Sequence, residues 1–184
     1  MNITPKKWNN VSEREKAKGV YLSAFPKEER LPWWLLRLFS CRRDMGITAY
    51  YDGHKFCGIT VSAATEKVLF LLFFAVEDDC RGRGCGSEIL QLLKKENPGR
   101  AIVLNVEPLD EAAENAAQRV SRMRFYNRNG FYDTGYDIDE VGGTFRVLSD
   151  RPLDAQAYLQ VFRRLSFGFW KPYLREAEQK KNGG

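Results

Sequence analysis

An unbroken run of nine apolar residues, from Val68 to Val76, constrains the fold of this chain more than any other feature. The run has the length of a β-strand and is half as long as a membrane-spanning helix needs to be. A strand whose residues are apolar on both of its faces is typical of the centre of a sheet that is covered on both faces. We therefore predict a central strand at 68–76 with helices packed on both sides of it.

The sequence around this run supplies the covering layers. Capping residues, apolar spacing and helix-stopping Pro or Gly residues predict helices over 12–24, 33–39, 87–96, 111–127 and 154–169. Further strands are predicted over 47–51, 56–63 and 101–107, with a strand pair within 131–149 bridged by Gly142-Gly143. This order predicts an α/β (α+β mixed) fold, a central mixed β-sheet flanked by helices. We expect a single domain over 1–184 with a polar tail at 175–184.

The charge and the cysteines narrow the choice of partners. Lys and Arg (29) exceed Asp and Glu (24), which gives a net charge of +5 and favours anionic partners in general. The four cysteines, Cys41, Cys57, Cys80 and Cys85, form no Cys-x-x-Cys pair, and a single His cannot complete a Cys/His zinc set. The first residues form no apolar signal segment. We therefore expect a cytoplasmic protein with reduced thiols, no metal and no membrane partner.

The segment that follows the central strand has the composition of an anion-binding loop. Arg81-Gly82-Arg83-Gly84-Cys85-Gly86 lies between the predicted strand and the next helix. Glycines at alternate positions let backbone N–H groups approach an anion, and the helix N-terminus adds unpaired donors and partial positive charge. The segment lacks the ending of a Walker A loop and the spacing of a dinucleotide-binding loop. We predict a pyrophosphate-binding loop; the alternative is a glycine-rich turn with its arginines in solvent.

Two motifs together resemble a known family. Arg81-x-x-Gly84-x-Gly86 is similar to the Arg/Gln-x-x-Gly-x-Gly/Ala signature of the GNAT superfamily of acetyl-CoA-dependent N-acetyltransferases. The segment Phe125–Phe131, which follows the pattern Phe-Tyr-x-x-x-Gly-Phe, resembles the element that comes next in that family. The motifs occur in the family's order, and the resemblance covers about 47–148. It implies the GNAT fold and acetyl-CoA as co-substrate.

The resemblance also implies which residues bind acetyl-CoA. In the family, loop amides hold the CoA pyrophosphate, and the end of the preceding strand pairs with the pantetheine arm. Transferred to this chain, the cofactor-binding residues are Phe74, Ala75, Val76, Arg81, Gly82, Arg83, Gly84, Cys85, Gly86 and Ser87. Arg119 departs from the family pattern, because many members have at this position an Asn that binds pantetheine.

Acetyl transfer from a thioester needs a proton donor for the departing thiolate and an acceptor for the amine proton. The resemblance gives the donor role to Tyr126; the alternative is a tyrosine packed at a helix end. On the predicted strand 101–107, Asn105 and Glu107 share one face. If that face lines the cleft, Glu107 is the candidate base, acting through water; otherwise it is a solvent-exposed carboxylate at a strand end.

We therefore expect an N-acetyltransferase that moves acetyl from acetyl-CoA to a primary amine by direct nucleophilic attack. Two alternatives stay open: a CoA-binding module that senses or docks without turnover, and a less favoured nucleic-acid-binding protein that uses the positive charge. The acceptor, a small molecule or a peptide, is not fixed by the sequence, nor is the oligomeric state, a homodimer included. Asp137, Asp139 and Glu140 either attract a cationic amine or lie on a solvent-facing hairpin.

Overall fold

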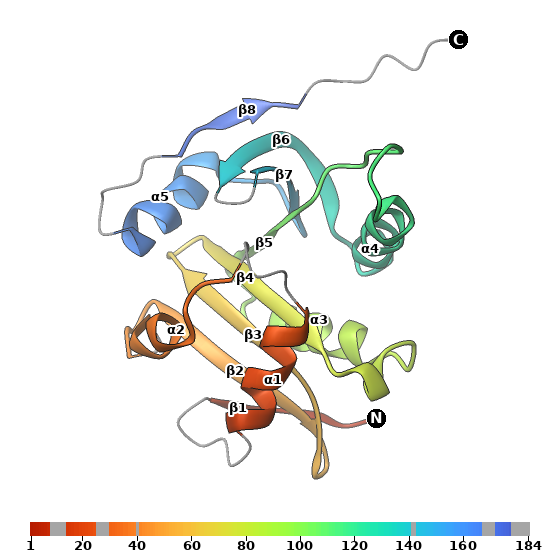
Figure 1. Ribbon diagram of the computed structural model, residues 1–184. Coiled ribbons are helices and arrows are strands. Elements are labelled where there is room, and N and C mark those ends of the chain that lie inside the picture. Colours follow the sequence, from red (N-terminus) through yellow and green to blue (C-terminus); the bar gives the residue numbers. More distant parts are fainter. Residues whose placement is uncertain (8–13, 25–29, 40, 141–142, 167–171, 178–184) are drawn as a thin grey trace.

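A computed structural model of the chain describes residues 1–7, 14–24, 30–39, 41–140, 143–166 and 172–177. Its centre is an eight-stranded sheet (Figure 1). The strands in sheet order are β1 (Ile3–Lys7), β2 (Met45–Asp52), β3 (Lys55–Ala64), β4 (Val68–Val76), β5 (Ala101–Val106), β7 (Gly143–Ser149), β6 (Tyr132–Glu140) and β8 (Leu174–Glu176). Neighbouring strands are antiparallel except for β4 and β5, which are parallel, so the sheet is mixed as predicted.

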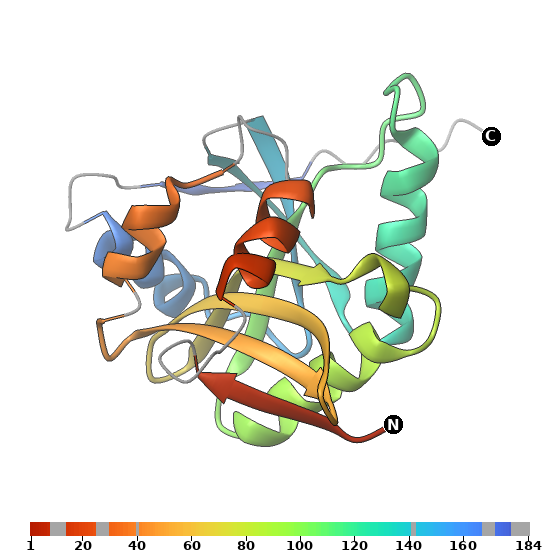
Figure 2. The ribbon, with the colours of Figure 1, turned by 60° about the horizontal axis from the view of Figure 1, so that its bottom comes forward.

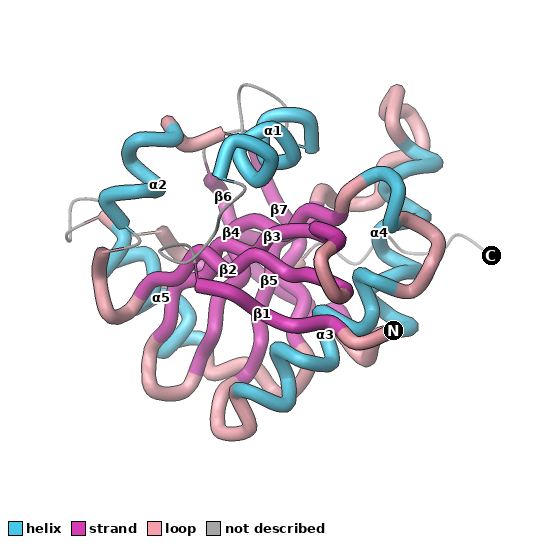
Figure 3. The backbone as a smooth tube through the Cα atoms, turned by 90° about the horizontal axis from the view of Figure 1, so that it is seen from below, coloured by secondary structure: helices cyan, strands magenta, loops and turns pink. Residues whose placement is uncertain are grey.

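Helices cover both faces of this sheet. The helices α1 (Arg14–Ala24), α2 (Trp33–Phe39) and α5 (Ala155–Leu165) pack on one face, while α3 (Cys85–Glu96) and α4 (Ala116–Arg128) pack on the other. A short 3-10 helix, η3 (Asp78–Cys80), precedes α3. Figures 2 and 3 show α1 and α3 on opposite sides of the strands. The apolar run at 68–76 is therefore buried from both sides, which confirms the prediction for β4.

The alternation of side chains between the two faces of β4 is interrupted once along the strand. Leu69 and Leu71 pack on the side of α3 and α4. The register between β3 and β4 then shifts, and Leu72 is left as an extra residue in a β-bulge. Beyond the bulge, Phe74 and Val76 lie on the α3 and α4 side. The bulge therefore turns a second pair of large side chains toward that face.

The strands β4 and β5 separate soon after they meet. They pair over three residue pairs, from Val68 with Ala101 to Phe70 with Val103. Beyond these pairs, within the described residues, β4 remains paired only on its other edge, with β3, and β5 only on its other edge, with β7. A cleft opens between the diverging ends, and both the end of β4 and the end of β5 line it.

Most sequence predictions agree with these elements, and the differences have local causes. The helix predicted over 111–127 begins only at Ala116, because residues 111–115 form turns. The strands β1 and β8 were not predicted; β8 falls partly within the segment predicted as a polar tail. Gly142 and residues 178–184 lie outside the described residues. In the part of the chain that the structure describes, no helix is long and apolar enough to cross a membrane. A single domain over 1–184 stays a prediction.

Candidate active site

A cleft of about 1280 Å³ runs from the glycine loop across the end of β4 to α5. Most of the predicted cofactor-binding residues line it, as do both predicted catalytic residues: Phe74, Ala75, Val76, Arg81, Gly82, Gly84, Gly86, Ser87, Glu107 and Tyr126. Arg83 and Cys85 are not among the described lining residues; Cys85 is buried beneath the loop, and Arg83 is exposed. The diverging strands thus bring the two sequence motifs to one cavity.

The glycine loop has the backbone that an anion-binding loop requires. Gly82 has φ of +70° and Gly84 has φ of +87°, in the left-handed region that favours glycine. Gly84 is the N-cap residue of α3, and its position supplies no side-chain cap to the first helical N–H groups. These donors and the helix dipole therefore remain available to an anionic ligand. A side chain at either glycine would strain the backbone that presents them.

Arg81 ties this loop to the end of β4. Its Nε donates a hydrogen bond to the carbonyl oxygen of Val76 at 3.2 Å, and its Nη1 lies 2.9 Å from Oδ1 of Asp78. The guanidinium thus lies at the junction between the strand end and the loop. The pair with Asp78 is exposed and contributes little to stability. Arg81 can exchange it for a phosphate at small cost.

Gly86 determines how closely α4 approaches α3. A Cβ atom at this position would lie 3.1 Å from Cζ of Phe125 and 3.4 Å from Cγ2 of Val76. The first distance is tighter than ordinary van der Waals contact, so the phenyl ring can lie where it does because residue 86 has no side chain. Phe125 directly precedes Tyr126, and Gly86 thereby helps to fix the position of the predicted acid.

Tyr126 lies in an aromatic cluster at the wall of the cleft. Its ring centroid is 5.2 Å from that of Phe125 and 5.9 Å from that of Phe131, both in edge-to-face geometry. Burial raises the pKa of Tyr126 to about 12, and the nearby charge of Arg122 opposes this only partly. The phenol therefore carries its proton throughout the neutral range, as a proton donor must.

Glu107 lies at the cleft, but its carboxylate is held by three donor groups. Asn115 Nδ2 donates to Oε1 and Oε2 at 3.1 and 3.2 Å, Arg119 lies 2.9 Å from Oε1, and Arg122 lies 3.0 Å from Oε2. Three donor groups thus make four contacts with the two oxygens, which offer roughly four acceptor positions. The group links the end of β5 to the start of α4, and these contacts favour this structural role over the base role. Arg119, the residue that departs from the family pattern, belongs to the same network.

A second carboxylate, Glu140 at the end of β6, lines the cleft without such an ion pair. Its Oε1 accepts a hydrogen bond from Nδ2 of Asn105. The Tyr158 hydroxyl donates to Oδ1 of Asn105 at 2.8 Å, which fixes the orientation of the amide. Burial raises the pKa of Glu140 to about 7, and the hydrogen bond from Asn105 opposes this. Glu140 therefore exchanges its proton near neutral pH.

The three acidic residues that the sequence singled out on this strand, Asp137, Asp139 and Glu140, thus divide into two kinds. Asp137 lies 2.6 Å from Arg146, and Asp139 lies 2.7 Å from Arg175, so both are ion-paired. Glu140 alone among the three lines the cleft. The sequence identified the three as a group but carried no signal that separates Glu140, because its environment is made by β5 and α5.

Comparison with known proteins supplies the family. A family model described as "Acetyltransferase (GNAT) domain" matches residues 43–133. YjbC of Bacillus subtilis (strain 168), whose name places it among acetyltransferases, is 36% identical over 73 residues, which cover 40% of this chain and 35% of that protein. The match thus spans about a third of the curated relative.

Solved structures show the same fold. A protein from Bacteroides thetaiotaomicron that is placed in the GNAT family has a TM-score of 0.69 and 22% identity, covering 92% of this chain and 100% of that one. An aminoglycoside 6'-N-acetyltransferase complexed with coenzyme A has a TM-score of 0.61 and 15% identity, covering 81% of this chain and 96% of that one. Since the family model spans both sequence motifs, this chain belongs to the GNAT family of acetyltransferases.

Proposed function

We propose that this protein transfers an acetyl group from acetyl-CoA to a primary amine by direct attack of the amine on the thioester. The observation that carries the proposal is one continuous cleft, which joins the uncapped N-terminus of α3 and its glycine loop to a protonated phenol and a carboxylate that titrates near neutrality. Acyl transfer to an amine needs an anion site, a proton donor and a proton acceptor together.

In this proposal the loop and the end of β4 hold the cofactor. The N–H groups at 82–87 bind the pyrophosphate, Arg81 supplies a full positive charge, and the backbone of Phe74–Val76 pairs with the pantetheine arm. Within the described residues, no strand pairs with β4 on its β5 side beyond Phe70, so the backbone groups of β4 there can pair with an extended ligand. The cofactor would then lie between the diverging strands and present its thioester to the middle of the cleft.

The chemical step is a balanced transfer of one acetyl group and two protons. The amine nitrogen forms a bond to the thioester carbon, and the carbon–sulfur bond breaks as the tetrahedral intermediate collapses. Tyr126 gives its proton to the departing CoA sulfur, and Glu140 takes the proton that the amine loses, directly or through one water. Tyr126 recovers a proton from solvent before the next turnover. Neither step needs an acyl-enzyme.

We assign the base role to Glu140 rather than to Glu107 because the Glu107 carboxylate already accepts more hydrogen bonds than that of Glu140. A base needs an oxygen lone pair free to face the amine, and the Glu107 carboxylate already makes four contacts with an asparagine and two arginines. Glu140 accepts from Asn105 and keeps its remaining lone pairs for the cleft. A base whose pKa is near 7 also operates close to the pH at which proton transfer is most effective.

The acceptor end of the cleft has apolar walls around this carboxylate. Leu35 of α2, Phe145 of β7, and Phe162 and Leu165 of α5 line it. We infer an acceptor, small molecule or peptide, whose primary amine is attached to an apolar carbon skeleton. The charge of Glu140 would attract the cationic amine, which releases one proton to solvent to become nucleophilic, and Glu140 then takes the second proton as the amide forms.

The test is a measurement of cofactor binding followed by turnover. Titration calorimetry with acetyl-CoA should show binding by the wild type, and release of free CoA should be measured with a panel of aliphatic and aromatic primary amines. The acid limb of the kcat/KM profile should fall near pH 7 and disappear in Glu140→Gln but persist in Glu107→Gln. Tight acetyl-CoA binding without turnover of any amine would instead support the sensor or docking alternative, and binding of a DNA oligomer in place of acetyl-CoA would support the nucleic-acid alternative.

A further inference from the structure

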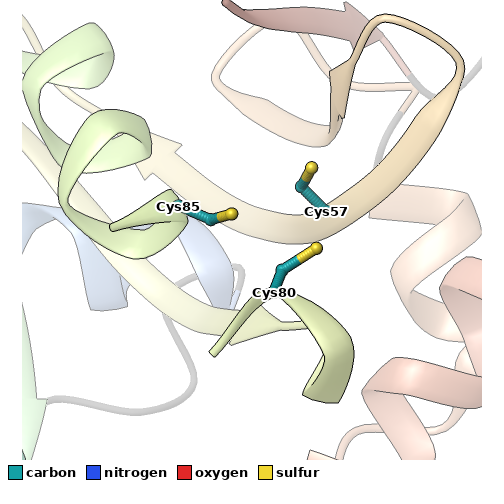
Figure 4. Close-up of side chains that lie close together, drawn as sticks. All are labelled: Cys57, Cys80 and Cys85. Carbon is teal, nitrogen blue, oxygen red and sulfur yellow. The ribbon is translucent and has the colours of Figure 1, made fainter. Parts of the chain in front are cut away.

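Three cysteines far apart in the sequence come together beneath the glycine loop. Cys57 belongs to β3, Cys80 ends η3, and Cys85 is the first residue of α3; all three are buried and free of disulfides. Their Sγ atoms lie within 4.8 Å of one another. Figure 4 shows the three side chains gathered where these elements meet. The spacing of the cysteines in the sequence does not predict this cluster, because Cys57 is brought to the other two by the pairing of β3 with β4.

The spacing of the sulfur atoms suits a metal ion. A zinc–thiolate bond is about 2.3 Å long, so three sulfurs arranged evenly around one ion lie about 4 Å apart. The observed separations, all below 4.8 Å, need only a small contraction to reach that value. The three ligands come from three different elements, so the fold holds them at this distance without a dedicated binding loop.

The donor set is composed of sulfur throughout. Sδ of Met1 lies 3.4 Å from Sγ of Cys85 and adds a thioether to the three thiols. Soft thiolate and thioether ligands select d10 ions such as Cu⁺ and Zn²⁺ over hard cations.

The contacts that the thiols make in this structure are weak. Cys57 Sγ lies 3.4 Å from the carbonyl oxygen of Lys55, and Cys80 Sγ lies 3.8 Å from that of Phe56. Simple packing, the ordinary role of a buried cysteine, does not require three thiols to gather within 4.8 Å of one another. We propose that Cys57, Cys80 and Cys85 bind one thiophilic d10 metal ion, Zn²⁺ or Cu⁺, through three thiolates, each thiol releasing its proton to solvent as its sulfur–metal bond forms.

This site would act on the loop above it. Cys80 and Cys85 immediately bracket residues 81–84, so one ion bound to both would tie the two ends of the loop to each other and, through Cys57, to β3. Because such an ion binds the folded protein in preference to the unfolded chain, it should also raise the melting temperature. The role is structural and independent of acetyl transfer.

The experiment uses the full chain without acetyl-CoA, so its result does not depend on the proposed function. Metal-free wild type, Cys57→Ala and Cys41→Ala are titrated with Zn²⁺, and anaerobically with Cu⁺, each against a chromophoric chelator. Cys41 is the matched control, because it is an exposed cysteine outside the cluster. We expect one equivalent bound by wild type and Cys41→Ala with a rise in melting temperature, and at least a tenfold loss of affinity in Cys57→Ala. The ion for which the protein has the higher affinity in these competition titrations is the metal that the site prefers.

A second measurement needs no variant. X-ray absorption at the metal edge of the loaded wild type should show three or more sulfur ligands and no more than one oxygen or nitrogen ligand. Binding of less than a stoichiometric amount, ligation dominated by oxygen and nitrogen, or equal affinity in folded Cys57→Ala would each overturn the proposal. If Cys57→Ala fails to fold, as circular dichroism would reveal, the stoichiometry and the absorption spectrum of the wild type decide.

Discussion

Replacing Glu140 by Gln should make the protein more stable at alkaline pH. The glutamine keeps an oxygen that can accept the hydrogen bond from Asn105 but carries no charge. Burial raises the pKa of Glu140 from its ordinary value of 4.5 to about 7. At about 1.4 kcal/mol per tenfold change in the proton equilibrium, this difference corresponds to roughly 3 kcal/mol at most.

The sign follows from which state is ionised first. Below about pH 4.5 the carboxyl is protonated in the folded and unfolded states, and the full stability is present. Between about pH 4.5 and 7 the unfolded chain loses its proton while the folded protein retains it, so the wild type loses stability as the pH rises. Above about pH 7 both states are ionised and the loss is complete. Glu140→Gln has no such loss.

The assay is urea unfolding of both proteins at several pH values from about 5 to 9, followed by circular dichroism. The difference in unfolding free energy should grow with pH and level off above about pH 8, whereas contributions from all other groups cancel in the difference. Asp139→Asn is the control, because it removes a carboxylate from the same strand at an exposed, ion-paired position outside the cleft. Parallel profiles for wild type and Glu140→Gln would refute the burial argument and remove the support for Glu140 as base.

Four further substitutions test the rest of the site. Gly84→Val should greatly weaken acetyl-CoA binding in calorimetry without unfolding the protein, because φ of +87° excludes a β-branched residue, whereas Gly99→Val, in open space, should bind normally. Arg81→Ala should flatten the salt dependence of CoA affinity, and an unchanged slope would mean that backbone amides alone bind the phosphates. Tyr126→Phe should lower kcat about 100-fold with little change in the KM for acetyl-CoA; agreement with wild type within about threefold from pH 6 to 10 would make it a packing residue. Glu107→Gln should destabilise the protein by about 1–3 kcal/mol in urea unfolding and leave kcat within severalfold, and a loss matching that of Glu140→Gln would restore Glu107 as base.

The sequence predicted the parts of the fold that are encoded locally. The central strand at Val68–Val76 could be predicted because a strand buried on both faces contains no polar residue. The glycine loop was visible because Gly82 and Gly84 occupy backbone conformations that favour glycine. The bulge at Leu72 was not visible, since a run that is apolar throughout gives no sign of which face each side chain takes.

The parts that escaped prediction depend on contacts between distant segments. Glu140 acquires its environment from Asn105 and Tyr158, which the chain brings in from β5 and α5. Glu107 met the stated condition of lining the cleft, but the two arginines and the asparagine that occupy it could not be placed from spacing alone. The strand β8 forms only because β6 offers it an edge.

The brief pairing of β4 with β5 has a mechanical consequence. Only three residue pairs join β4 to β5, so the two parts of the sheet that meet at this seam share few backbone contacts. The glycine loop follows β4 on one side of the seam, while Asn105 and Glu140 belong to strands on the other side. A small rotation about this seam would change the gap between cofactor and base while leaving each binding surface intact. We therefore expect substitutions at Val68, Leu69 and 101–103, none of which lines the cleft, to change the rate of the reaction.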